Sequence, residues 1–112
     1  MDLSEARAFA LSLPGATEEP HFELTSFRVR RKIFATADPE GSFLHVFVDE
    51  LEVRGAVALD SGAFEELWWG KRLSGVRVWL ARAEPEVVRD LLEDAWRRRA
   101  SKAQQAEWDP SR

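Results

Sequence analysis

Helical spacing of apolar residues predicts a helix near each end of the chain. The first covers about residues 3–12, where apolar side chains recur every three or four positions until Pro14 and Gly15 end it. The second covers residues 84–99 and carries the stronger signal, with a proline in its first turn and three arginines at its C-terminal end. Its apolar stripe consists of Val88, Leu91, Leu92, Ala95 and Trp96.

Alternation of apolar and polar residues after the first helix predicts two strands. Residues 16–24 contain a proline and several acids, and we expect them to form a connecting loop. Residues 25–30 alternate strictly, and residues 32–38 are rich in β-branched and aromatic side chains. The short link between these two runs, near residues 31–32, predicts a β-hairpin, although it lacks the glycine that tight hairpin turns favour.

The middle of the chain predicts three further strands and one more helix. A Pro-Glu-Gly-Ser turn precedes a strand over residues 43–49, and Asp49 can cap a helix over residues 50–59. Residues 63–69 and 76–81 are expected to be strands, joined by a turn between two glycines at residues 70–75.

The predicted order is therefore α-β-β-β-α-β-β-α, in which helices and strands are segregated rather than alternating. This order predicts an α+β fold, with an antiparallel sheet and helices packed on one of its faces. A chain of 112 residues fits one domain, which we place over residues 1–100. Residues 101–112 form a polar tail that is expected to fray, although Trp108 offers a side chain that can dock.

Composition narrows the chemistry. The chain has five Trp and seven Phe but no Cys, which excludes disulfides, thiolate catalysis and cysteine-based metal sites. Neither a signal peptide nor an apolar run of membrane-spanning length is present, so we expect a soluble cytoplasmic protein with no membrane partner. Neither a serine nucleophile elbow nor a glycine-rich phosphate loop is visible, so we expect no enzymatic activity and no cofactor.

Charge is distributed unevenly along the chain. Residues 24–37 and 67–83 each hold four cations and no acid, whereas the other 81 residues hold eight cations and twenty acids. Both acid-free stretches are predicted hairpins with cations at or near their tips. Such a pattern is typical either of solvated strand faces that resist edge pairing or of a surface that contacts phosphate, and both interpretations stay open.

Three short motifs, in this order and spacing, resemble the MmcQ/YjbR-like family. The first is Pro14, Gly15 and Glu18; the second is the strand–turn–strand with Phe27, Val29, Lys32 and Phe34; the third is the last helix, LLEDAWRRRASK. The resemblance covers residues 3 to about 100 and implies an α+β domain like that of secretion chaperones. It also implies DNA binding through two β-hairpin wings. The family commonly has Gly before the hairpin lysine, where this chain has Arg31.

The sequence therefore carries two functional hypotheses. The first is weak binding of double-stranded DNA or another polyanion by a monomer, through the hairpin cations Arg28, Arg30, Arg31, Lys32, Lys71, Arg72 and Arg77. The second is a module that binds a protein or a small ligand on a sheet face with an exposed tryptophan. Trp68 and Trp69 are adjacent on a strand, so their side chains point to opposite faces and one is expected to be exposed. His21, which we place on a loop, is the remaining ligand-binding candidate; its carboxylate neighbours lack the spacing of a metal site.

Overall fold

One antiparallel sheet of six strands, in the order β1-β2-β3-β4-β6-β5, forms the centre of the structure. The computed structural model describes residues 1–109. Its elements are α1 (Leu3–Ser12), β1 (Thr17–His21), β2 (Leu24–Val29), β3 (Lys32–Ala37), β4 (Phe43–Val46), α2 (Glu50–Leu59), β5 (Phe64–Trp69), β6 (Arg72–Trp79), α3 (Pro85–Arg97) and α4 (Lys102–Trp108).

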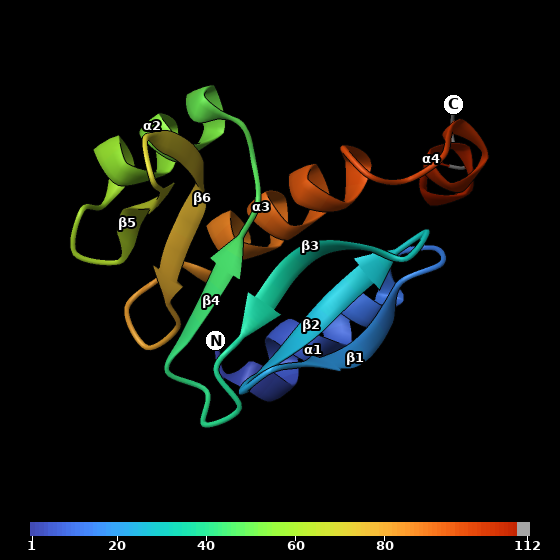
Figure 1. The fold of residues 1–112 in the computed structure, drawn as a ribbon, viewed down its shortest axis with the longest axis horizontal. Helices are drawn as coiled ribbons and strands as arrows, with labels where there is room; N and C mark the ends of the chain where they lie inside the picture. The colour runs from blue at the N-terminus through green and yellow to red at the C-terminus, as the bar shows by residue number, and fades with distance from the viewer. Residues whose placement is uncertain (110–112) are drawn as a thin grey trace.

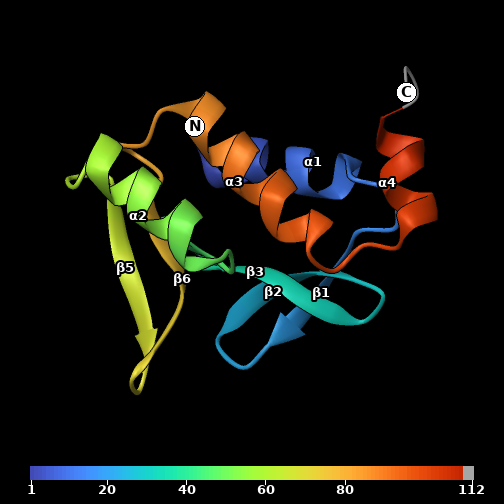
Figure 2. The same cartoon turned by 90° about the horizontal axis from the view of Figure 1, so that it is seen from above.

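The helices cover one face of the sheet, as Figures 1 and 2 show, so the α+β prediction is confirmed. The core lies between the two layers because each layer presents one apolar face to the other. All five residues of the stripe predicted on α3 are buried, and the sheet contributes Phe27, Leu44, Val46, Val76 and Val78. None of the helices within residues 1–109 is long and apolar enough to cross a membrane.

The expected loop over residues 16–24 is wrong, because residues Thr17–His21 form strand β1 at the sheet edge. Most of this strand is exposed, so neither of its faces carries an apolar pattern that the sequence could reveal. Pro20 is tolerated because an edge strand pairs on only one side. Glu18 anchors the strand, since it accepts hydrogen bonds from Arg7 of α1 and Thr25 of β2. Burial alone would raise the pKa of Glu18, but these hydrogen bonds hold it below its usual value.

The turn expected over residues 70–75 is shorter than the two glycines suggest. Only residues 70–71 form the turn, and β6 already begins at Arg72. Gly75 lies inside the strand, where a Cβ atom would clash with the carbonyl oxygen of Val46 on the neighbouring strand. The glycine therefore permits a close approach of two backbones rather than a reversal of the chain.

The tail does not fray over its described part, because residues Lys102–Trp108 form helix α4. Ser101 and Gln104 make a capping box at its start. Trp108 packs edge-on against Phe9 of α1 and Trp96 of α3, with ring centroids 6.2 Å apart in both cases. The docking expected of Trp108 is thus confirmed; residues 110–112 lie outside the described part.

Candidate functional site

A row of side chains crosses the sheet on the face that the helices leave open. The strand register aligns one residue from each strand, in the order Glu19, Ser26, Thr36, His45, Arg77 and Glu65. In β3 this alignment depends on a bulge, because Phe27 pairs with Ala35 while Arg28 pairs with Ile33. The extra residue turns Ile33 and Thr36 toward the same face although they are three positions apart.

Two of the predicted phosphate-binding arginines are engaged within this row. Arg77 donates from Nε to Nε2 of His45 at 3.1 Å and pairs with Glu65 at 3.7 Å. Burial, together with the positive charge of Arg77, lowers the pKa of His45 to about 4, so its ring is a neutral acceptor at pH 7. Arg28 donates to the hydroxyl of Ser26 at 2.9 Å. Arg28 also lies 3.9 Å from a carboxylate oxygen of Glu19, so a nearby carboxylate offsets the charge of each of these two arginines and makes it a weaker phosphate contact.

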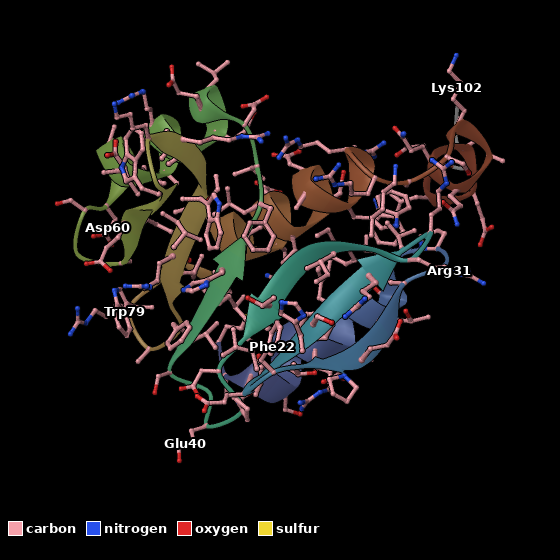
Figure 3. The ribbon with its side chains drawn as sticks, viewed as in Figure 1. Phe22, Arg31, Glu40, Asp60, Trp79 and Lys102 are labelled. Carbon is pink, nitrogen blue, oxygen red and sulfur yellow. The ribbon has the colours of Figure 1, made fainter. Side chains whose placement is uncertain are left out.

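The hairpin tips, in contrast, carry free cations. Arg30, Arg31 and Lys32 at the β2–β3 tip, and Lys71 and Arg72 at the β5–β6 tip, form no ion pair with any described residue. The two tips lie toward opposite ends of the long axis in both Figure 1 and Figure 2, and Figure 3 marks the first of them by Arg31. They do not form one continuous patch.

The β2–β3 turn has an unusual backbone. Val29 pairs with Lys32, so Arg30 and Arg31 form a two-residue loop, and both have positive φ angles of 53° and 67°. Two consecutive positive φ angles define the type I′ turn, which ordinarily contains Asn-Gly. The arginine that replaces the usual glycine of the family therefore keeps the left-handed conformation, at a cost in backbone strain.

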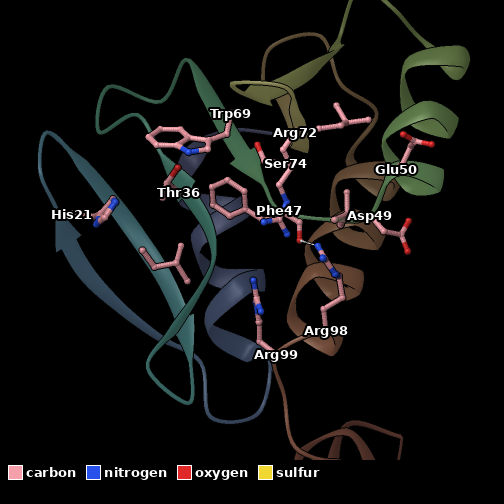
Figure 4. A pocket seen from close by; sticks show the side chains of 13 residues that line it. His21, Thr36, Phe47, Asp49, Glu50, Trp69, Arg72, Ser74, Arg98 and Arg99 are labelled. Carbon is pink, nitrogen blue, oxygen red and sulfur yellow. Dashed lines mark hydrogen bonds between the residues drawn. The ribbon is translucent and has the colours of Figure 1, made fainter.

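A cavity of about 490 Å³ lies between the two hairpins, at the point where β4 ends. Arg98 and Arg99, just after α3, line it, as does Arg72 from the β5–β6 hairpin (Figure 4). Arg98 reaches back to donate to the carbonyl oxygen of Phe47 at 2.7 Å. Arg30 donates to the carbonyl oxygen of Arg99 at 3.4 Å, which joins the β2–β3 tip to the same region. The end of α3 thus contacts the β2–β3 tip and the segment after β4, and it lines the cavity together with Arg72 of the β5–β6 hairpin.

The structure divides the three ligand-binding candidates. His21, which ends strand β1 and does not lie on the expected loop, lines the cavity together with Trp69, whereas Trp68 does not. Trp68 is 48% exposed and Trp69 81% exposed, because the tip of the β5–β6 hairpin extends away from the layer of helices (Figure 2). Trp68 donates from Nε1 to Glu66 at 3.1 Å, while Trp69 makes no contact of this kind within the described chain.

Of the residues that line this cavity, only His21, Trp69 and Arg72 were expected from the sequence; the others, among them Thr36, Phe47, Arg98 and Arg99, were not. A signal was available for the two arginines, which belong to the run of three at residues 97–99, but their charge was explained by the helix dipole. Only Arg97 of that run is neutralised, by Glu93 at 3.0 Å and Asp109 at 2.8 Å. Within residues 1–109, no group of three His, Asp or Glu side chains is placed to hold a metal ion.

The residues that carried the family resemblance have structural roles. The carbonyl oxygen of Pro14 accepts a hydrogen bond from Nε1 of Trp96 at 3.0 Å, and Phe34 is the fully buried extra residue of the bulge. Glu18 joins α1, β1 and β2 as described above. These motifs therefore explain how the fold is held together, and they do not by themselves define a binding site.

Fold and motifs together place the chain in a class of small α+β domains. A model of the YjbR family matches residues 11–98, and the chain belongs to this family. A crystal structure of the Deinococcus radiodurans protein DR2400, described as a DUF419 domain, is similar to it with a TM-score of 0.75 and 19% sequence identity. The similarity covers 94% of this chain and 86% of that one and shows a shared fold. No curated protein matches the sequence.

Proposed function

We propose that this YjbR-family chain is a non-enzymatic domain that binds DNA or another polyanion through a cationic cleft between its two hairpins. One observation carries the proposal: a set of cations around the cleft has no carboxylate partner within the described residues. We call this set the cleft cations: Arg72, Arg98 and Arg99 line the cavity, and the hairpin tips on either side of it add Arg30, Arg31, Lys32 and Lys71.

Unpaired cations are concentrated at the hairpins and the cavity between them; elsewhere within residues 1–109 only Arg82, Arg89 and Lys102 also lack an ion pair. Arginines elsewhere, such as Arg7, Arg54 and Arg97, form ion pairs of 2.8–3.4 Å. Arg28 and Arg77 are likewise paired, so the proposal leaves them out. A chain with a net charge of −4 that leaves its cleft cations unpaired presents a local positive potential, which attracts phosphate.

Strain and helix polarity support the same role. The C-terminal end of a helix carries partial negative charge and repels anions unless cations offset it, as Arg98 and Arg99 do here. The β2–β3 tip keeps two arginines in a left-handed turn that glycine would adopt at less cost. Backbone strain of this kind is commonly retained where the side chains serve a function.

The test is fluorescence anisotropy with a labelled DNA duplex at about 50 and 200 mM salt. If four of the cleft cations contact phosphates, affinity falls about 100-fold over this fourfold change in salt. The double variant Arg31→Gln/Lys71→Gln removes one charge from each tip, and we expect the logarithmic salt slope to shrink by about 2 units.

Arg89→Gln is the matched control, because Arg89 lies on α3 away from the cleft and has no ion pair within residues 1–109. It should leave both affinity and salt slope unchanged. The proposal is overturned if micromolar protein does not bind the duplex at low salt, or if the tip variant binds with the wild-type slope.

A further inference from the structure

The cavity between the hairpins has two chemically different walls. Trp69, Phe47, Ile33 and Leu73 supply an aromatic and aliphatic wall, and Arg98 and Arg99 supply a cationic end (Figure 4). A volume of about 490 Å³ is typical of a small-molecule site, which usually combines apolar walls with a few polar groups. The volume and lining of the cavity therefore fit a small molecule with an apolar, aromatic body and an anionic group.

Thr36 provides an independent sign that a ligand belongs here. Its side chain is 3% exposed and lines the cavity, and its hydroxyl is the one buried side-chain polar atom among the described residues without a hydrogen-bond partner. Its neighbours in the row are satisfied, since Ser26 donates to the carbonyl oxygen of Glu19 and His45 accepts from Arg77. Unpaired buried hydroxyls are rare, because burial removes their bonds to water.

Trp69 is the second unusual group. The other tryptophans are engaged: Trp68, Trp79 and Trp96 donate hydrogen bonds from Nε1, and Trp108 packs against two rings. Trp69 stands 81% exposed at the rim of the cavity, with its indole free to stack. An exposed indole beside guanidinium groups is the arrangement by which proteins hold an unpaired base next to its phosphate.

Carboxylates at the cavity edge do not cancel the arginines. Asp49 accepts from the backbone N–H of Glu52 at 3.1 Å as the cap of α2, and Glu50 pairs with Arg54 at 3.4 Å. Among the described residues, neither arginine at the end of α3 has an ion-pair partner. Arg98 uses one donor on the carbonyl oxygen of Phe47, and its remaining donors, with those of Arg99, are available to an incoming anion.

The geometry points to a nucleotide site: we infer that the cavity binds a base with its attached phosphate. The base stacks on Trp69 and covers Ile33 and Leu73, the phosphate meets Arg98 and Arg99, and the hydroxyl of Thr36 pairs with a polar edge of the base. A free nucleotide and an unpaired residue of a nucleic-acid strand bring the same chemistry. The inference does not rest on duplex binding, because a free nucleotide needs none of the hairpin-tip contacts.

Calorimetric titration with thymidine 5′-monophosphate, and with single-stranded oligothymidylate of about ten nucleotides, tests the site. Trp69→Ala should weaken binding about tenfold, because base stacking on an aromatic ring is lost. Trp68→Ala is the matched control, since it removes the neighbouring exposed indole that does not line the cavity. Its affinity should stay at the wild-type value.

Thr36→Val gives a signature that a purely structural role would not produce. Replacing the unpaired hydroxyl with a methyl group should raise the melting temperature of the free protein by about 2–4 °C. The same variant should bind the nucleotide about fivefold more weakly, because its hydrogen bond to the base is lost. A variant that is more stable but binds less well identifies the hydroxyl as a ligand contact.

The outcomes separate the two sources of the ligand and the two proposals. Binding of the mononucleotide identifies a free nucleotide, and binding of the oligonucleotide alone identifies an unpaired strand. The inference is wrong if neither the mononucleotide at millimolar concentration nor the oligonucleotide at micromolar concentration binds. It is also wrong if Trp69→Ala and Trp68→Ala weaken binding equally. Loss of duplex binding with intact nucleotide binding rejects only the proposed function.

Discussion

The left-handed arginine turn makes a quantitative prediction about stability. Arg31 has a φ of 67°, and its side chain forms no hydrogen bond or ion pair with any described residue. A non-glycine residue in this region costs about 1–2 kcal/mol in backbone strain. Glycine removes that strain, but it also raises the conformational entropy of the unfolded chain, which lowers the free energy of unfolding by about 0.5–1 kcal/mol. On balance, Arg31→Gly should stabilise the protein by about 1 kcal/mol.

The β5–β6 turn supplies a matched control. Lys71 occupies the corresponding second turn position and also forms no hydrogen bond or ion pair within the described residues. In that turn, however, only Gly70 has a positive φ. Lys71→Gly removes the same charge without relieving strain, so the entropic term alone remains and should cost about 0.5–1 kcal/mol.

Differential scanning calorimetry distinguishes the two variants. One kcal/mol corresponds to roughly 4 °C for a domain of this size, so Arg31→Gly should melt higher than wild type and Lys71→Gly lower. The reasoning about strain is refuted if the two glycine variants change the melting temperature in the same direction. Because Arg31 is also a cleft cation, the stabilised variant should bind duplex DNA more weakly, which links the strain to function.

Two further predictions concern the backbone and the acidic face. Gly75→Ala should destabilise the protein by at least about 2 kcal/mol in urea denaturation, because the added Cβ meets the carbonyl oxygen of Val46; Gly55→Ala, at an open helical position, should be neutral or stabilising. Burial, and then the charge and hydrogen bond of Glu52, raise the pKa of Asp94 to about 6. Between pH 4 and 6, Asp94 is therefore protonated in the folded state but ionised in the unfolded state. Protonated Asp94 favours the folded state, and this stabilisation is lost as the pH rises through 6. Asp94→Asn should stabilise the protein by about 1 kcal/mol at pH 7.5, after allowance for solvent screening, and by progressively less toward pH 4. A stabilisation by Asp94→Asn that does not change with pH would contradict this. Glu107→Gln, at an exposed position, is the control variant.

Local patterns were enough to predict the main helices and the first hairpin. The stripe on α3 is readable because residues three and four apart share a helix face whatever the rest of the chain does. Asp49 caps α2, which spans the ten predicted residues, for the same local reason. Strand β1 and helix α4 were missed because tertiary partners hold them: Arg7 and Thr25 bind Glu18 of β1, and α1 and α3 surround Trp108.

The sequence by itself determined the fold class, the family resemblance and the existence of two hairpins with cations near their tips. Only the tertiary structure decided which of their cations are free, because ion pairs such as Arg77 with Glu65 depend on strand register. It also decided that the tips lie apart and that Arg99, Thr36 and Trp69 meet at one cavity. These residues are thirty or more positions apart in the sequence, and no local periodicity records a contact that strand pairing and helix docking create.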